Sequence, residues 1–427
     1  MSGIFAIYAF DEVWKIAKIL YYGILSLNHR GQSESGMVIG PQLRFMISGG
    51  DVEKSYNVEE LVDLEGWYGI GWVNSPVVSK KNYTTINVDG KKFSIISYTP
   101  IRDIEDRLYN CLKYCMEDIS KGLEYLNKLC IEIRRPITFV AINDNEEMYV
   151  YRDVSGLKPL QIGSYGFDLA LISSESCALE CVGGDYRCDI SPGCLIKIDK
   201  YGIDRVESGN ISRVCALEFI YYSRLDSIVE GVSIYRFRRE LAKILAEKYR
   251  FDNIDIVVGI PETGIVYASE FSKFANIEFS IGFVQTGRRV RSALIEDILE
   301  RLIGVQLKMS PIRYVLSGKN ILLIDDSLLK GVTLRSIVQY LRNRVGVGHI
   351  HALIMSPMIV RSCPYYMEIP PENELICANI SKSELADVLG LDSIHFADLE
   401  DLYRAFENVG IDRERICTYC MGGRLAW

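Results

Sequence analysis

The fold of the second half of the chain is decided by residues 319–333, which read KNILLIDDSLLKGVT. The apolar run ILLI predicts a strand that is buried on both faces. Asp325 and Asp326 end this strand, and a short turn with Lys330 and Gly331 leads into an amphipathic helix. Ligands of open α/β sheets bind at the carboxyl ends of the strands, and the first turn of a helix offers free backbone N–H groups to a phosphate. The stretch therefore predicts a sugar-phosphate site, although alone it also fits a solvated Asp-Asp turn after a core strand.

This stretch resembles the phosphoribosylpyrophosphate (PRPP) binding motif of type I phosphoribosyltransferases. More narrowly, it is similar to the version in amidophosphoribosyltransferases, DDSIVRGTT. The chain replaces the arginine of that motif by Lys330 and its first threonine by Val332, which cannot donate a hydrogen bond to a phosphate. We therefore expect PRPP binding that is weakened but not lost. The resemblance assigns to PRPP binding Asp325, Asp326, Ser327, Lys330, Gly331 and Thr333.

Length and composition limit the class of protein. A chain of 427 residues is long enough for two domains, and 48% hydrophobic with 24% charged residues is typical of a globular protein. A net charge of -8 without a basic tract disfavours binding to nucleic acid. The sequence has no apolar run of about 18 residues and no features of a secretory signal, so we expect no membrane helix. We expect a cytoplasmic protein.

Residues 1–212 are expected to form a first domain of short strands and turns. They resemble the class II glutamine amidotransferase domain, an α+β N-terminal-nucleophile fold in which two stacked antiparallel sheets lie between helices. Helices are predicted at residues 13–27 and 104–129. The segments that carry the resemblance are His29–Gln32, Arg152–Leu160 and Ser174–Ala178.

The glutaminase chemistry of that domain is expected to be lost. Members of the family attack glutamine with an N-terminal cysteine, and this chain has Ser2, a weaker nucleophile that alone leaves the question open. The arginine that holds the glutamine carboxylate is replaced by Asn74, and a neutral amide cannot replace a bidentate cation. The Asn-Gly pair of the oxyanion hole falls at Tyr98 and Thr99. A further aspartate of the family has no counterpart within residues 103–118.

From about residue 213 the pattern changes to alternating strands and helices, which implies an α/β domain with a parallel, doubly wound sheet. Residues 213–427 resemble the type I phosphoribosyltransferase domain, and the segment Pro261–Gly264 resembles its pyrophosphate loop. Thr263 alone is explained equally well as a helix cap. The resemblance assigns to PRPP Glu262, Thr263 and Gly264, and to Mg²⁺ Thr263, Asp325 and Asp326.

Residues 285–293 resemble the flexible loop that closes over PRPP in the family. Arg291 matches the family pattern and is assigned to PRPP, whereas the first lysine and the first arginine of the pattern are missing. Arg288 and Arg289 lie nearby in the sequence, and a solvated basic loop is the rival interpretation. We expect loop closure over the pyrophosphate to be altered.

Cys417 and Cys420 form a C-x-x-C pair, which is a weak signal by itself. In one branch of the family such a pair joins two further cysteines in holding a [4Fe–4S] cluster, and Cys215 and Cys363 match those positions. Four thiolates suit a cubane cluster, and Zn²⁺ is the alternative because it takes the same number of ligands. The other eight of the twelve cysteines are expected to be buried.

The resemblance implies an amidophosphoribosyltransferase of purine biosynthesis. It would bind Mg-PRPP and form 5-phosphoribosylamine from free ammonia, or from ammonia supplied by a partner, without hydrolysing glutamine. The alternative is a non-catalytic paralogue that binds PRPP or a nucleotide and regulates or partners an active homologue. The altered turn and loop favour the alternative, and the retained acid pair favours the enzyme. The resemblance also implies regulation by purine nucleotides and a homo-oligomer, or a hetero-oligomer with an active homologue.

The histidines are expected to have structural roles. Neutral ammonia requires no general base when it attacks C1′ of the ribose, and no histidine falls within the matched PRPP motifs. His29, together with Arg30 and Arg152, is expected to hold loops and the interface between the domains.

Overall fold

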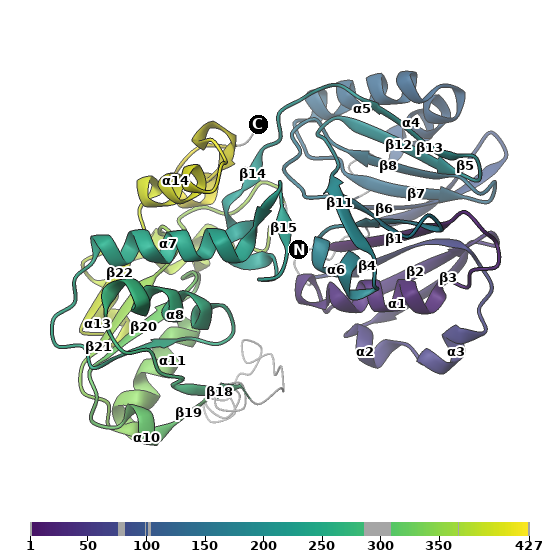
Figure 1. The fold of residues 1–427 in the computed structure, drawn as a ribbon. Helices are drawn as coiled ribbons and strands as arrows, with labels where there is room; N and C mark the ends of the chain where they lie inside the picture. Colours follow the sequence, from purple (N-terminus) through teal and green to yellow (C-terminus); the bar gives the residue numbers. More distant parts are fainter. Residues whose placement is uncertain are drawn as a thin grey trace.

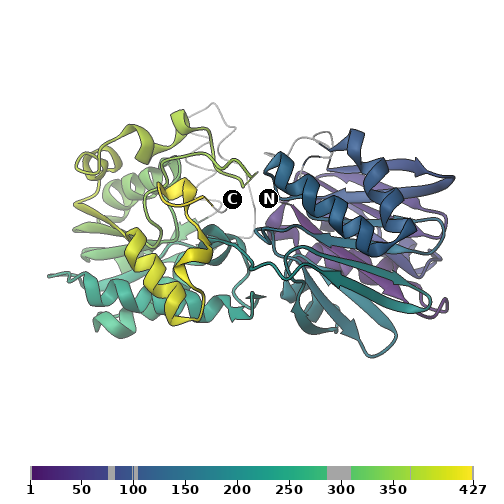
Figure 2. The ribbon, with the colours of Figure 1, turned by 90° about the horizontal axis from the view of Figure 1, so that it is seen from above.

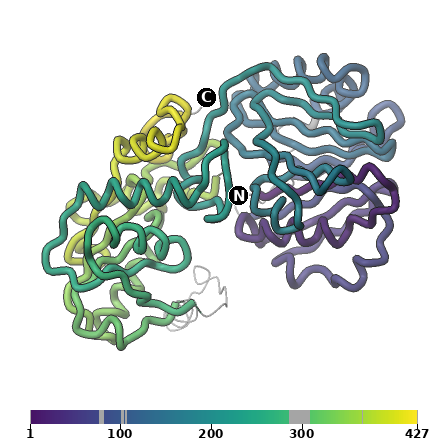
Figure 3. Tube along the Cα trace, in the orientation of Figure 1, coloured from purple at the N-terminus to yellow at the C-terminus, as the bar shows by residue number. Residues whose placement is uncertain are grey.

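The computed structural model describes residues 2–75, 82–98, 100, 104–285, 309–365 and 367–425, apart from the side chains of residues 105 and 106. They form two bodies that lie side by side, and both chain ends lie near the junction (Figures 1 and 2). The chain trace crosses from the first body to the second close to this junction (Figure 3). Within the described ranges, no helix is long and apolar enough to cross a membrane.

The first body is a sandwich of two antiparallel sheets with helices outside it (Figure 1). Its strands are β1 (Gly3–Ala9), β2 (Glu34–Gly40), β3 (Arg44–Gly49), β4 (Tyr68–Asn74), β5 (Tyr83–Val88), β6 (Lys91–Ser97), β7 (Phe139–Asn143), β8 (Met148–Arg152), β9 (Gln161–Tyr165), β10 (Leu169–Ser173), β11 (Asp185–Asp189), β12 (Cys194–Asp199) and β13 (Gly202–Glu207). Its helices are α1 (Ala17–Ser26), η1 (Asn28–Arg30), α2 (Val52–Ser55), α3 (Val58–Val62), α4 (Glu105–Glu117), α5 (Ile119–Ile133) and α6 (Ser176–Cys181). The sheet orders are β11-β9-β10-β1-β4-β2-β3 and β13-β12-β8-β7-β6-β5.

Alternation of side chains along the strands builds three apolar layers in this body. Ile4 and Trp72 point between the two sheets and pack against Val140. Phe5, the neighbour of Ile4, points to the opposite face and packs beneath α1. Helices α4 and α5 cover the outer face of the second sheet in the same way. This architecture confirms the predicted N-terminal-nucleophile-type fold.

Two helix predictions in this body were wrong at their ends. Helix α1 begins at Ala17 and not at residue 13, because the Asp11 carboxylate accepts the Val13 N–H at 3.0 Å and closes a turn there. The helix predicted over 104–129 is two helices, because Asp118 is extended and caps α5 by accepting from the N–H groups of Ser120 and Lys121.

The second body contains a parallel sheet of order β17-β20-β21-β22. Its strands are β14 (Val214–Cys215), β15 (Ile228–Val229), β16 (Val232–Ser233), β17 (Ile256–Gly259), β18 (Phe283–Gln285), β19 (Met309–Pro311), β20 (Ile321–Asp325), β21 (Ile350–Ile354), β22 (Ser393–Phe396) and β23 (Ile416–Cys417). Its main helices are α7 (Ile234–Lys248), α8 (Thr263–Ala275), α10 (Arg313–Leu316), α11 (Val332–Tyr340), α12 (Ile376–Asn379), α13 (Leu385–Leu389) and α14 (Leu399–Asn408). Short helical turns are η4 (Glu218–Tyr222), η6 (Leu341–Val345), η7 (Glu372–Glu374), η8 (Arg413–Arg415) and η9 (Tyr419–Met421).

Strand β20 is buried on both faces, as its apolar run predicts. Leu322 and Ile324 pack on the side of α7 and α8, whereas Ile321 and Leu323 pack on the side of α11. The predicted α/β class of this half is therefore confirmed. Residues 218–222 form a π-helical turn, and Phe279 makes an isolated bridge with Val257 ahead of strand β18.

Buried ion pairs join the two bodies. Arg30 of η1 is 2% exposed; it contacts Glu175 within the first body, and its Nη2 lies 2.8 Å from Glu218 of the second. Arg152 is also buried and donates from Nη2 to Glu230 of the second body at 2.6 Å. These contacts confirm that Arg30 and Arg152 hold the junction between the two halves. His29 contributes through Glu175, from which its Nε2 lies 2.8 Å.

Candidate functional site

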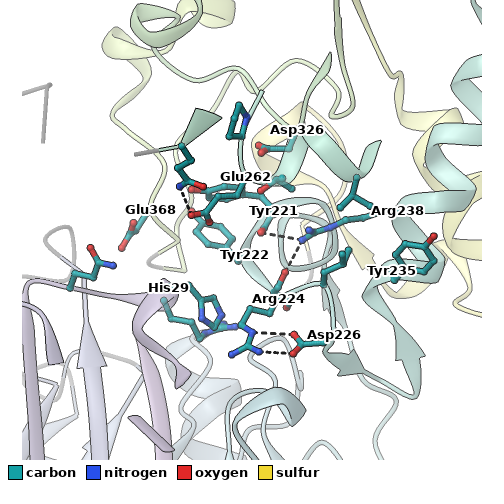
Figure 4. A pocket seen from close by; sticks show the side chains of 18 of the residues that line it. His29, Tyr221, Tyr222, Arg224, Asp226, Tyr235, Arg238, Glu262, Asp326 and Glu368 are labelled. Carbon is teal, nitrogen blue, oxygen red and sulfur yellow. Dashed lines mark hydrogen bonds and ion pairs between the residues drawn. The ribbon is translucent and has the colours of Figure 1, made fainter. Parts of the chain in front are cut away.

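A cavity of about 1200 Å³ lies at the junction and is lined by both halves (Figure 4). The first half contributes His29, Arg30 and Gln32. The second half contributes residues from η4, α7, the start of α8 and the end of β20. The size and the mixed polar lining suit a charged small molecule.

The acid pair lies at the end of β20: Asp325 is the last residue of the strand, and Asp326 lines this cavity. The Asp326 N–H donates to Oδ1 of Asp325 at 2.9 Å, and the Ser327 hydroxyl donates to Oδ1 of Asp326 at 2.6 Å. The backbone is fixed from β21, because the N–H groups of Met355 and Ser356 donate to the two aspartate carbonyls. Burial and the charge of its neighbour raise the pKa of Asp325, and burial also raises the pKa of Asp326. Two adjacent carboxylates in such surroundings favour a divalent cation.

The loop Pro261–Gly264 lies directly beside the acid pair. The Ile260 N–H donates to the Ile324 carbonyl at 2.9 Å, which ties the end of β17 to the end of β20. A Cβ on Gly264 would lie 2.4 Å from the same carbonyl, so only glycine allows α8 to start this close to β20. Thr263 is the first residue of α8, and no side chain caps that helix. The Thr263 side chain partly offsets the effect of burial, which raises the pKa of Asp326, so it lies beside the acid pair; it does not cap the helix.

The turn before α11 has the geometry of an anion-binding helix start. Gly331 has φ of 73°, a conformation that favours glycine, and the nine-residue helix begins at the next position. Lys330 forms an ion pair with Glu374 of η7. Val332, at the position of the missing hydroxyl, is 46% exposed. The turn therefore presents backbone N–H groups to a ligand, but the ammonium group of Lys330 is already paired with Glu374.

Several predicted residues lie outside the described part of the chain. Arg291 and its neighbours Arg288 and Arg289 are among them, as is Thr99 of the expected oxyanion-hole pair. Strands β18 and β19 pair antiparallel on either side of residues 286–308.

The expected glutamine site has a closed arrangement of side chains. Asn74 and Asn82 are buried and exchange two amide hydrogen bonds of 2.7 and 2.8 Å. Asn74 also donates to Oε1 of Glu34 at 3.0 Å, so its hydrogen-bonding capacity is used within the protein. Tyr98 is 4% exposed, and its hydroxyl donates to Ser174. Ser2 is 3% exposed, and its hydroxyl has no hydrogen-bond partner among the described residues.

Comparison with known proteins identifies the family. No protein-family model matches the chain. A curated amidophosphoribosyltransferase of Methanocaldococcus jannaschii is 30% identical, and the alignment covers 99% of this chain and 97% of the relative. The chain belongs to the amidophosphoribosyltransferase family. The Bacillus subtilis member is 28% identical over 94% of this chain and 89% of its own length. The solved B. subtilis glutamine PRPP amidotransferase, complexed with ADP and GMP, has a TM-score of 0.82 at 27% identity and covers 99% of this chain and 97% of that chain.

The fold brings the four cysteines that match the cluster ligands of the family to one region near the junction. Cys215 and Cys417 are register partners in the parallel pair β14 and β23, so their side chains leave the same face. The carbonyl of Cys420 accepts from the N–H groups of Val360 and Arg361, which brings the segment with Cys363 beside η9. Burial and the three other thiols raise the pKa of Cys215. The described residues contain no group of three or more His, Cys, Asp or Glu placed to hold a single metal ion.

Six of the remaining eight cysteines are buried, as predicted. Cys181 is exposed and Cys188 is half-buried, so burial was predicted wrongly for these two. The buried ones are Cys111, Cys115, Cys130, Cys177, Cys194 and Cys377.

Several residues that line the cavity were not identified from the sequence motifs. Arg238 of α7 is 3% exposed and donates to the carbonyls of Phe219, Tyr221 and Ser223, so it shapes the turn η4. A buried arginine within an apolar helix face was a usable signal, because such a cation requires acceptors nearby. Glu368 gave no signal, because its place at the cavity depends on tertiary structure alone.

Proposed function

We propose that this protein is an amidophosphoribosyltransferase of purine biosynthesis that binds Mg-PRPP and forms 5-phosphoribosylamine from ammonia. The observation that carries this proposal is the acid pair at the end of β20, of which Asp326 lines the cavity beside the pyrophosphate loop. The names of the relatives support the same activity.

The proposed contacts divide PRPP between two loops. The turn before α11 would hold the 5′-phosphate on its N–H groups, with the carboxylates accepting from the ribose hydroxyls. The loop before α8 would hold the pyrophosphate. Mg²⁺ commonly binds proteins through one or two carboxylates plus substrate oxygens, and the acid pair with Thr263 fits that pattern. When bound, the ion would neutralise the departing pyrophosphate. The PRPP contacts proposed are Glu262, Thr263, Gly264, Arg291, Asp325, Asp326, Ser327, Lys330, Gly331 and Thr333.

In the proposed reaction the nitrogen of ammonia forms a bond to C1′ while the bond from C1′ to the pyrophosphate oxygen breaks. The protein would contribute by positioning and by charge stabilisation more than by covalent chemistry.

We also propose that glutaminase activity is absent. The closed Asn74–Asn82 pair supports this, because a glutamine carboxylate would meet no free cation at that position. Tyr98 supports it as well, because this residue, at the position matched to the oxyanion hole, is buried and donates its hydroxyl to Ser174. Residues 1–212 would then be a retained scaffold, and residues 213–427 the catalytic domain.

Two features of the turn before α11 favour the rival function, a non-catalytic PRPP- or nucleotide-binding regulator of an active homologue. Lys330 is paired with Glu374, and the hydroxyl expected at position 332 is absent, so phosphate binding is weakened at two positions. A steady-state assay separates the two functions. Release of pyrophosphate from PRPP with ammonium, and none with glutamine, supports the enzyme. PRPP binding without turnover supports the regulator.

For the cysteines we propose a [4Fe–4S] cluster. One zinc ion requires four sulfurs at about 2.3 Å from a single point, whereas a cubane separates its thiolates by its own iron and sulfide atoms. The pairing of Cys215 with Cys417 and the approach of the Cys363 segment to Cys420 support one site shared by the four cysteines. Its role would be structural, holding the C-terminal segment to the junction. Iron and sulfide analysis of anaerobically purified protein tests this.

A further inference from the structure

His29 lies on the part of the cavity wall that the first half contributes (Figure 4). Its side chain is 20% exposed, and its Nε2 lies 2.8 Å from Oε1 of Glu175, which is fully buried. Glu175 is itself fixed from the second half, because the Arg224 N–H and the Ser227 hydroxyl donate to its other oxygen at 2.9 and 2.7 Å. The imidazole is therefore held in one orientation at the junction.

The same contact determines which ring nitrogen is basic. Burial raises the pKa of Glu175, but His29, Arg30 and the hydrogen bonds to the carboxylate outweigh it and lower the pKa well below its usual range. An ionised carboxylate can only accept hydrogen bonds, so Nε2 of His29 carries the proton and donates. In the neutral imidazole, Nδ1 is then the nitrogen without a proton. Within the described ranges, Nδ1 has no hydrogen-bond partner.

Loss of the glutaminase reaction would change the form in which the nitrogen reaches this place. An active glutaminase releases neutral ammonia inside the protein, whereas ammonia taken from solvent at neutral pH arrives mainly as ammonium. Ammonium has no lone pair and cannot attack C1′ until it loses a proton. This step of the reasoning rests on the proposed function.

We propose that His29 is the general base that converts ammonium to ammonia in the cavity. An N–H bond of ammonium breaks, and its proton goes to Nδ1 of His29. The nitrogen lone pair then forms the bond to C1′ as pyrophosphate leaves with the bonding electrons. The imidazolium and the new amine each lose a proton to solvent.

The charges around His29 suit this role. Glu175 stabilises the imidazolium without taking its proton, as the buried carboxylate does in other carboxylate–histidine pairs. Glu368 lines the same cavity, and its carboxylate attracts a cation into it. The cationic side chains near His29 are engaged: Arg30 with Glu175 and Glu218, and Arg224 with Asp226.

The test compares two nucleophiles in a His29→Gln variant. Glutamine retains an N–H donor for Glu175 but has no basic nitrogen. With ammonium at pH 7 we expect kcat/KM to fall about 100-fold, the lower end for loss of a general base. With hydroxylamine, which is neutral at this pH, we expect little change. Raising the pH until free ammonia predominates is expected to restore the rate of the variant.

Ser227→Ala is the matched control, because it removes a hydrogen bond to the same carboxylate but leaves the imidazole in place. We expect it to affect both nucleophiles equally, if at all. An equal loss with ammonium and hydroxylamine in His29→Gln overturns the assignment, as does a loss that persists at high pH. A wild-type protein that turns over PRPP with neither amine refutes the proposed function itself, and the role of His29 with it.

Discussion

Replacement of Arg30 by methionine tests how the two halves are held together. The arginine is 2% exposed and contacts Glu175, and its Nη2 lies 2.8 and 3.1 Å from the two carboxylate oxygens of Glu218. Methionine fills similar volume but leaves two buried carboxylates without their cation. Removal of one partner from a buried ion pair costs about 3–5 kcal/mol. At about 2–4 °C per kcal/mol for domains of this size, the melting temperature should fall by about 6–20 °C.

Differential scanning calorimetry measures this effect, and Arg404→Met is a suitable control. Arg404 pairs with Glu247 at 3.1 Å, but both side chains are about half exposed, so this pair should contribute no more than about 1 kcal/mol. If the melting temperature falls as little in Arg30→Met as in Arg404→Met, the prediction is wrong, because the junction then does not depend on the buried ion pair.

Three further predictions concern the carboxylates and the expected nucleophile. Glu374→Gln should tighten Mg-PRPP binding several-fold in titration calorimetry, because Lys330 loses its ion pair and can reach the phosphate. An unchanged affinity would show that Glu374 does not compete with the phosphate for Lys330. The free energy of unfolding should fall as the pH drops below the usual Glu175 pKa of 4.5, because a carboxyl with a lowered folded-state pKa stabilises only while ionised. Denaturant unfolding at several pH values measures this free energy. It should depend less steeply on pH in Glu175→Gln than in the wild type, and equal pH dependence would contradict the prediction. Ser2→Ala should leave the ammonium-dependent rate unchanged, and glutamine hydrolysis that disappears in this variant would show that the first half is active.

Local sequence signals were sufficient for the part of the site that lies on one strand and its turn. Asp325 and Asp326 follow an apolar run long enough to predict a buried strand, and the chemistry of the turn can be read from Gly331. The π-helical turn 218–222 could not be predicted this way, because the four residues after Glu218 are apolar or aromatic and fit a strand equally well. Its shape depends on Arg238, which lies on a different element.

The place of His29 at the cavity also depends on long-range structure. Its sequence neighbours indicate a scaffold motif, and only the contact with Glu175 and the approach of the second half bring it to the substrate side. The closed Asn74–Asn82 pair is a similar case. The sequence shows that Asn74 replaces an arginine of the family. No local pattern, however, pairs it with Asn82.

The most direct test of the account is isothermal titration calorimetry of Mg-PRPP against the wild-type protein and an Asp325→Asn/Asp326→Asn variant. The two substitutions remove the paired negative charge but retain the size of both side chains. We expect the wild type to bind PRPP only with Mg²⁺, and the variant to lose affinity by at least about 100-fold. Equal affinities, or no binding by the wild type, would contradict the assignment of this acid pair to PRPP.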